Sequence, residues 1–342
     1  FHLAQRGQKV LGIDQFGIAH SQGSSFGESR IFRVSQFAGP EYVPLAIRAK
    51  ELWSELEHYA DENIFFRTGG LDAGPEDGPV FSGALKSCEE SKISYELLNS
   101  QTIKDRYPAL DLPETYKAVY QEDAGILVPE RAVSAHINAA IEHGADINTF
   151  EKITDITPGA TSVTVITAKG EYTAEKVVLS GGPWTGEILP ILKDTLTPER
   201  GCVAWFLPQN RKNFKIGALP IFIIDDEQTG SFYGFPELGR PGFKIGANTH
   251  LQEYGTAEGL RRGFDTNDEK RLRHYLQYFN EPNDMPITAS SDCVWTLTPD
   301  EHFILDHHPD HDNIAIAAGF SGYGFKFCPV IGEIMADLII KG

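Results

Sequence analysis

The sequence predicts an α/β fold, α+β overall, whose two domains are interleaved along the chain. Short apolar strands that end in an acid or in glycines occur near the start, middle and end, around residues 9–14, 177–184 and 313–324. Residues 202–246 instead alternate β-rich segments with Pro and Gly, which favours a second domain with a mixed, largely antiparallel sheet. At roughly 150 residues per domain, 342 residues are enough for both.

The opening segment has the pattern of half a nucleotide-binding unit. It shows a helix end, a glycine stop at Gly7 and a strand over residues 9–13 that ends in Asp14. In a dinucleotide-binding βαβ unit, such an acid binds the ribose hydroxyls of an adenosine. The first half of that unit, a strand and a G-x-G-x-x-G turn, is expected to precede Phe1. Alternatively, Asp14 is a strand-end acid that faces solvent, and the pattern alone leaves both open.

Periodicity and turn residues predict the remaining elements. Helices are expected over residues 44–60, 129–143, 266–279 and 326–340. Strands are expected over residues 146–150, 153–156, 163–167, 171–173, 176–180 and 313–317. We therefore assign residues 1–60, 132–192 and 290–342 to the nucleotide-binding domain. Residues 61–131 and 193–289 form the second domain.

Composition excludes several classes of partner. The formal net charge is -18, so the surface repels phosphate backbones and a nucleic-acid partner is not expected. No apolar run approaches the roughly 18 residues that span a bilayer, so no membrane partner is expected either. Four cysteines without a CxxC pair are typical of a reducing compartment, and the cytoplasm is predicted.

No metal site is predicted. The histidines between residues 302 and 311 do not have a known ligand spacing and are expected in a polar turn. They are His302, His307, His308 and His311.

Long ordered motifs carry a family resemblance. They are residues 20–33 (HSQGSSFGESRIFR) with 41–44, 233–236 (YGFP), 242–246 (GFKIG), and 293–306 with 319–327 (GFSGYGFKF). In these motifs the chain resembles the family of monomeric sarcosine oxidase, N-methyltryptophan oxidase and pipecolate oxidase, which are FAD-dependent amine oxidases. The resemblance covers essentially the whole chain, and the family chain is expected to extend beyond both of its ends.

The resemblance implies a fold and a reaction. The fold is an FAD domain interleaved with a substrate domain. The reaction is oxidation of a secondary amino acid, N-methyl or cyclic, by hydride transfer to the flavin, with dioxygen reduced to hydrogen peroxide. The implied partners are a small secondary amine with a carboxylate and dioxygen, and the implied state is a monomer.

The resemblance also implies roles for four chemically active residues. Cys293 matches the cysteine that carries the flavin covalently, although a lone cysteine is more often a buried structural thiol. Arg33 and Lys326 match the pair that holds the substrate carboxylate, and their alternative is a surface salt bridge. Lys244 matches the lysine that activates dioxygen, and its alternative is the polar face of a strand.

The remaining site residues are also carried over from the family. Near the substrate Tyr233 is retained, whereas Tyr323, Asn248 and Trp295 replace the usual histidine, histidine and tyrosine, so sarcosine itself is not predicted as the substrate. The implied cofactor contacts, besides Cys293 and Lys326, are Asp14, His20, Ser24, Ser25, Ser29, Arg30, Ile153, Ser180, Gly182, Trp184, Gly322, Gly324 and Phe325.

Other functions stay open. One is a flavin dehydrogenase that passes electrons to a quinone or a carrier protein. Another is a degenerate, non-catalytic fragment that serves only as a binding module. A nicotinamide dehydrogenase is disfavoured, because Cys293 and the loop at Tyr323 would then have no role.

Overall fold

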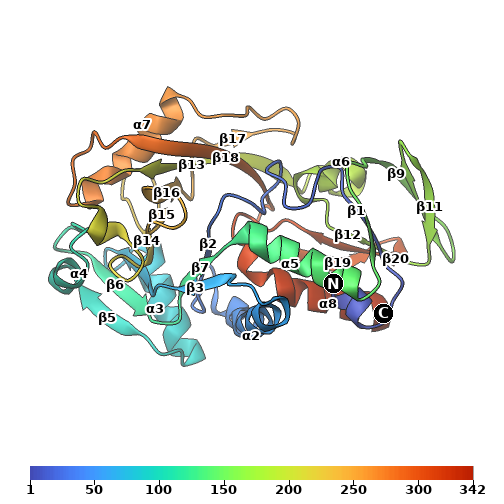
Figure 1. The fold of residues 1–342 in the computed structure, drawn as a ribbon, viewed down its shortest axis with the longest axis horizontal. Coiled ribbons are helices and arrows are strands. Elements are labelled where there is room, and N and C mark those ends of the chain that lie inside the picture. Colours follow the sequence, from blue (N-terminus) through green and yellow to red (C-terminus); the bar gives the residue numbers. More distant parts are fainter. Residues whose placement is uncertain (342) are drawn as a thin grey trace.

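The computed structural model describes residues 1–341 as two packed halves, one dominated by a large sheet and one rich in helices (Figure 1). The large sheet has nine strands in the order β17-β13-β16-β15-β14-β4-β6-β5, with β18 also paired to β13. Only the β14–β4 pairing is parallel, which confirms the mixed, largely antiparallel sheet. Its strands are β4 (Gly70–Gly74), β5 (Glu96–Asn99), β6 (Lys117–Gln121), β13 (Thr197–Phe206), β14 (Ile221–Ile224), β15 (Phe232–Phe235), β16 (Phe243–Ala247), β17 (Glu253–Tyr254) and β18 (Ile287–Leu297).

The core of the sheet half is aromatic. Phe206, Phe222, Phe232, Phe243 and Phe279 are at most 4% exposed and belong to one hydrophobic cluster. The ring centroids of Phe243 and Phe279 are 4.8 Å apart, a distance at which aromatic pairs add to the gain from burial. This half also contains α3 (Pro79–Ser91), α4 (Ser100–Arg106) and α7 (Thr266–His274).

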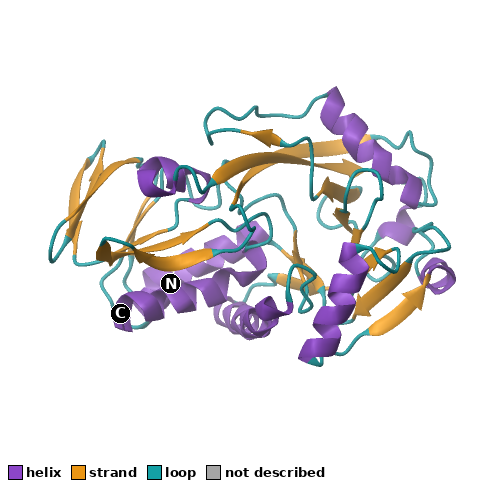
Figure 2. Ribbon diagram, turned by 180° about the vertical axis from the view of Figure 1, so that it is seen from behind, coloured by secondary structure: helices purple, strands orange, loops and turns teal. Residues whose placement is uncertain are grey.

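The helix-rich half contains two separate parallel strand pairs. β1 (Leu11–Ile13) pairs with β8 (Asp146–Asn148), and β12 (Val177–Leu179) pairs with β20 (His311–Ala318). β19 (Ile304–His308) extends the second pair in antiparallel fashion. Seen from behind, helices gather along the side of these strands near the two chain ends (Figure 2). The helices are α1 (His2–Gln5), α2 (Val43–Ala60), α5 (Pro129–Glu142), α6 (Thr185–Ile188) and α8 (Cys328–Lys341).

Two small sheets complete this half. β2 (Arg30–Phe32), β7 (Gly125–Leu127) and β3 (Phe65–Arg67) form one of them, and β9 (Ile153–Pro158), β10 (Val163–Thr167) and β11 (Gly170–Ala174) form the other. No helix within residues 1–341 is long and apolar enough to cross a bilayer.

Several predicted elements differ from the observed ones. The helix expected from residue 326 begins as α8 at Cys328, because residues 325–327 form a 3₁₀ turn. The helix expected over 266–279 ends at His274 and continues as a 3₁₀ turn to residue 278. The histidine segment is not a polar turn alone, since His307 and His308 lie in β19 and His311 begins β20. The domain boundaries stay a prediction.

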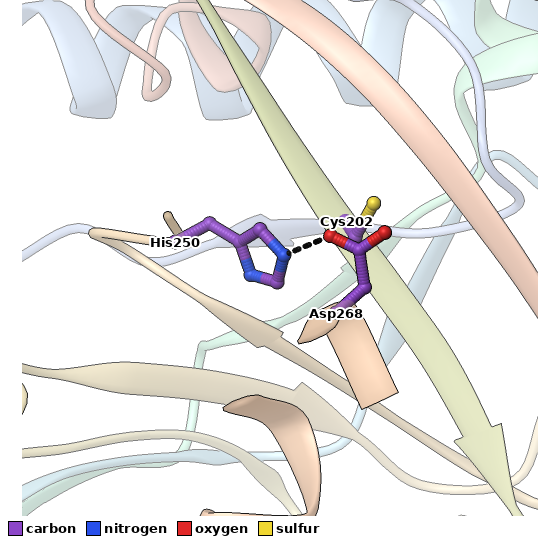
Figure 3. Close-up of side chains that lie close together, drawn as sticks. All are labelled: Cys202, His250 and Asp268. Atoms are coloured by element: carbon purple, nitrogen blue, oxygen red, sulfur yellow. Dashed lines mark hydrogen bonds and ion pairs between the residues drawn. The ribbon is translucent and has the colours of Figure 1, made fainter. Parts of the chain in front are cut away.

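A buried ionic network holds α7 against β13 (Figure 3). The fully buried Arg200 of β13 donates to both carboxylate oxygens of Asp268 at 2.9 Å. His250 approaches the same carboxylate at 2.8 Å through Nε2. Asp268 also accepts a hydrogen bond from the backbone of Asp265, which completes the capping box of α7. Each charge in this network therefore has a hydrogen-bonded partner of opposite sign.

The same network includes a group of metal-ligand residue types. The ligand atoms of Cys202, His250 and Asp268 lie within 4.8 Å of one another. However, Arg200 also reaches Cys202 Sγ at 2.9 Å, so a guanidinium already supplies the positive charge beside the thiol and the carboxylate. A second cation here would be repelled, and we assign the group a structural role.

We predict that Asp268→Asn lowers the free energy of unfolding by about 3 kcal/mol. The substitution removes the fully buried partner of Arg200 and leaves the partly exposed carboxylate of Glu253, at 2.6 Å, to balance that charge. Burial opposes ionisation of Asp268, but hydrogen bonds from Arg200, His250 and Arg261 outweigh it and lower its pKa. The contribution is therefore present above the unfolded aspartate pKa of about 3.9 and is lost as the pH falls below it.

Urea unfolding at neutral and acidic pH checks this prediction, with the exposed Asp284→Asn as the charge-matched control. A loss no larger than that of the control would contradict it.

Candidate active site

A cavity of about 2460 Å³ passes between the two halves of the molecule. On one side its lining comes from β1, β8, β12 and the segment 319–326, and on the other from β14, β15 and β18. Of the predicted site residues, only Ser29 and Lys244 do not line it. Those that do are Asp14, His20, Ser24, Ser25, Arg30, Arg33, Ile153, Ser180, Gly182, Trp184, Tyr233, Asn248, Cys293, Trp295, Gly322, Tyr323, Gly324, Phe325 and Lys326.

One end of the cavity is formed by the strand ends around Asp14. Its carboxylate accepts a hydrogen bond from the backbone of Phe16 at 2.7 Å and lies 3.7 Å from His20 Nε2. The ring of Phe16 lies 5.4 Å from that of Trp184, whose buried Nε1 has no hydrogen-bond partner. This end of the cavity therefore has an acid just after β1, where a dinucleotide-binding unit has its ribose ligand, and two aromatic rings beside it.

The loop over residues 20–30 crosses from this end to β18. Ser24 Oγ donates to the carbonyl of Val294 at 2.5 Å, and Arg30 donates to the carbonyl of Ser24 at 2.7 Å. Glu130, at the start of α5, accepts hydrogen bonds from the backbone N–H groups of Gly27 and Glu28 at 2.6 and 3.0 Å. Glu130 was not predicted, and an acid in the first turn of a helix is too common to be a signal by itself.

Lys244 lies beneath this loop, in β16. It is 1% exposed, and its Nζ donates to the carbonyl of Gly27 at 2.8 Å and to Ser29 Oγ at 3.0 Å. The rings of Trp205 and Phe235 lie 5.2 and 4.9 Å from Nζ. Burial and then Arg30 lower the pKa of Lys244 well below its usual value. Lys244 is thus buried rather than exposed on the polar face of a strand, and it does not line the cavity.

Cys293 lies in β18 directly opposite Gly201 of β13. A Cβ at residue 201 would overlap the ring of Trp295, so only glycine lets the indole cover β13 beside the thiol. Burial raises the pKa of the Cys293 thiol, and the cations Arg30 and Lys244 act in the opposite direction. The thiol is thus partly exposed and has two cations nearby, while burial acts against its ionisation.

Arg33 and Lys326 form a buried cationic end of the cavity. Both are 5% exposed. Arg33 donates to Asp72 at 3.2 Å, but its buried Nε has no partner. Within residues 1–341 the Lys326 ammonium makes a single hydrogen bond, a long one of 3.4 Å to Gln36 Oε1. Two cations facing one carboxylate leave an excess of positive charge, so this end of the cavity is suited to an anion.

Asp72 and Gln36 were missed by the sequence reasoning. The available signal was an acid inside a buried strand, since Asp72 stands between Leu71 and Ala73 in β4. Burial raises the pKa of Asp72, and Arg33 and Ser35 oppose that shift.

The wall beyond Cys293 contains the predicted substrate residues. The Trp295 ring lies 3.8 Å from the position that a Cβ on Gly322 would take, so this loop and the indole are in close contact. Tyr323 donates to the carbonyl of Glu301 at 2.6 Å. Asn248 donates to Ser231 Oγ at 2.7 Å, and burial raises the pKa of Tyr233.

The order of these residues along the cavity fits FAD. Asp14 at the end of β1 would bind the ribose, and Cys293, Arg30 and the glycine loop 319–324, which line the same cavity, would hold the ring. The unpartnered buried Nε1 of Trp184 and Nε of Arg33 are donors that a bound cofactor and a substrate carboxylate would satisfy.

Comparisons with known proteins identify similar sequences and a similar fold. The profile of the DAO family, described as FAD dependent oxidoreductase, matches residues 1–338. Monomeric sarcosine oxidase of Bacillus sp. (strain NS-129) is 37% identical over 100% of this chain and 89% of its own length. N-methyl-L-tryptophan oxidase of Citrobacter koseri is 32% identical over 98% of this chain and 90% of its own length. The fold resembles that of NikD, an unusual amino acid oxidase of nikkomycin biosynthesis, with a TM-score of 0.85 at 23% identity over 99% of this chain and 89% of NikD.

We predict that a small carboxylate such as acetate binds less tightly as the pH rises toward the usual lysine pKa of 10.5. Burial and then Arg33 lower the pKa of Lys326, so its ammonium loses its proton, and with it the charge that holds the anion, below that pH. Isothermal titration calorimetry with acetate, over neutral to alkaline pH, measures the effect.

Lys326→Arg is the matched control, since its guanidinium stays charged over the whole range and its affinity is expected to change little. If the wild type and the variant lose acetate in parallel, Lys326 is not the titrating group.

Proposed function

The chain belongs to the FAD-dependent oxidoreductase family, and on that premise we propose that it oxidises a secondary amino acid, N-methyl or cyclic, and reduces dioxygen to hydrogen peroxide. The observation that carries the proposal is the buried, charge-excess pair of Arg33 and Lys326 in the cavity that also contains Cys293. Asp72 is the carboxylate beside these two cations, and a bound anion would balance the remaining positive charge and give the free Nε of Arg33 an acceptor.

In this proposal Arg33 and Lys326 bind the substrate carboxylate and so fix the neighbouring carbon. Asp72 holds Arg33 in place, and Gln36 does the same for Lys326. FAD, when bound, accepts a hydride from the carbon next to the amine nitrogen and passes the two electrons to dioxygen. Water then hydrolyses the imine that the substrate has become.

Lys244 is proposed to favour the reaction with dioxygen. Its ammonium is fixed by Gly27 and Ser29 in a dry environment, where a positive charge stabilises developing negative charge strongly. The two aromatic rings beside it exclude water further. The same loop would separate it from the substrate, which suits a residue that acts on the opposite face of the ring.

The proposal includes covalent attachment of the flavin to Cys293. Burial raises the pKa of the Cys293 thiol, and Arg30 and Lys244 are the nearby cations that oppose this shift and would stabilise a thiolate once it forms. It also includes a monomer, as in the printed name of its sarcosine oxidase relatives, and a cytoplasmic location, supported by four cysteines that are all free thiols.

We predict that the protein supplied with FAD consumes dioxygen and forms an equal amount of hydrogen peroxide when given sarcosine, N-methyltryptophan or pipecolate. Lys244→Met is expected to slow reoxidation by dioxygen on the order of 10²-fold while anaerobic reduction by the amine stays close to that of the wild type. An oxygen electrode and stopped-flow absorbance of the flavin measure the two steps.

Rapid anaerobic reduction with little peroxide, relieved by a quinone, would favour the dehydrogenase instead. Protein that stays colourless after addition of FAD would favour the non-catalytic fragment.

We predict that Cys293→Ala removes covalent flavin. After acid precipitation of the wild type the yellow colour should stay with the pellet, whereas in the variant it should move to the supernatant. Cys328→Ala is the control, because Cys328 lines the same cavity and is also a free thiol. Colour in the wild-type supernatant would refute the covalent link and leave the oxidase proposal intact.

A further inference from the structure

One wall of the cavity carries an acid that the proposed reaction does not use. Glu199 lies in β13 opposite Trp295 of β18, and it lines the cavity although it is only 4% exposed. Its carboxylate accepts one side-chain hydrogen bond, from Trp295 Nε1 at 2.9 Å. It forms no ion pair with any of residues 1–341, so its only donor is neutral.

Keeping Glu199 ionised at this buried position costs free energy. Burial removes the water that would solvate a carboxylate, and a single indole N–H does not replace it. Burial raises the pKa of Glu199 and nearby Glu301 adds to that shift, while the Trp295 hydrogen bond opposes it. A positive partner would remove the cost, and the cavity is the open side from which one can arrive.

The acid lies beyond the reacting centre rather than at it. Residue 199 is two positions from Gly201, roughly 7 Å along the strand, and Gly201 is the residue opposite Cys293. The indole of Trp295 covers Gly201, and its N–H edge meets Glu199. The indole therefore stands between the cysteine that would carry the flavin and the carboxylate of Glu199.

The cavity therefore has a positive region and a negative region. Arg33 and Lys326 form the positive end, with a buried Nε that lacks an acceptor. Glu199 forms a negative wall, and the exposed Glu301 lines the cavity as well. A ligand that carries both a carboxylate and a separate cation would satisfy both places at once.

We infer that Glu199 binds a cationic side chain of the substrate, so that the enzyme prefers secondary α-amino acids with a basic side chain. This inference rests on the proposed function, because it takes the carboxylate anchor of Arg33 and Lys326 as given. The substrate carboxylate lies at the cationic end, the reacting carbon lies at the ring, and the ammonium or guanidinium reaches past Trp295 to Glu199. The indole N–H keeps the acid oriented toward the cavity.

Binding without turnover tests the inference first. Hexanoate and 6-aminohexanoate differ in one terminal ammonium, and isothermal titration calorimetry on the FAD-supplied protein gives the affinity of each. We expect the wild type to prefer 6-aminohexanoate by about tenfold or more. Glu199→Gln, which keeps an oxygen for Trp295, should abolish that preference and leave the affinity for hexanoate within about twofold.

Glu114→Gln is the control, since it removes the same charge from an exposed position outside the cavity and should keep the preference. An equal preference in the wild type and Glu199→Gln, or no preference in the wild type, would overturn the inference.

Turnover then separates this inference from the proposed function. The ratio of kcat/KM for Nα-methyl-lysine to that for Nα-methylnorleucine should fall about tenfold or more in Glu199→Gln, mainly through KM for the lysine derivative. If both compounds are oxidised with an unchanged ratio, the oxidase proposal survives and the role of Glu199 is refuted. If neither is oxidised while the calorimetric preference depends on Glu199, the ligand class stands and the proposed reaction fails.

Discussion

The antiparallel pairing of β13 with β18 is the constraint on which the rest of the site depends. Its register sets Cys293 against Gly201 and Trp295 against Glu199 on one face of the sheet. In a β-ladder, a slip of one residue would turn all of these side chains to the other face. The ladder is held from outside by the buried Arg200–Asp268 pair, which ties α7 to the same strand. The strand that carries Arg200 of this ion pair is therefore also the strand that faces Cys293.

Charge balance across the cavity explains why the two halves form one site. Lys244 belongs to the large sheet, but its ammonium is held by the carbonyl of Gly27 in the loop of the other half. Arg33 belongs to the helix-rich half, but its carboxylate partner Asp72 lies in the large sheet. Each half therefore buries a cation that has a hydrogen-bond partner in the other half, and separating the halves would remove these contacts.

Much of the fold could be predicted because its signals are local. The helices α2 and α5 follow from apolar periodicity with proline in the first turn, and β10 from its β-branched residues. The strand order of the large sheet was harder to predict, because it depends on contacts between strands far apart in the sequence. The parallel pairing of β14 with β4 is an example. The helices α3 and α4 were not predicted, because turn residues in their part of the chain were not expected to belong to helices.

The candidate site was likewise predictable only where the sequence carries a local signal. Residues in long motifs, such as Cys293 and Lys326, could be named from the sequence, and the structure brings them to one cavity. Three acids could not be predicted, because each is recognisable only by a contact that the fold creates. Glu130 binds the Gly27 backbone, Asp72 binds Arg33, and Glu199 binds Trp295. All three are acids in a chain with net charge -18, where a single glutamate or aspartate carries no signal.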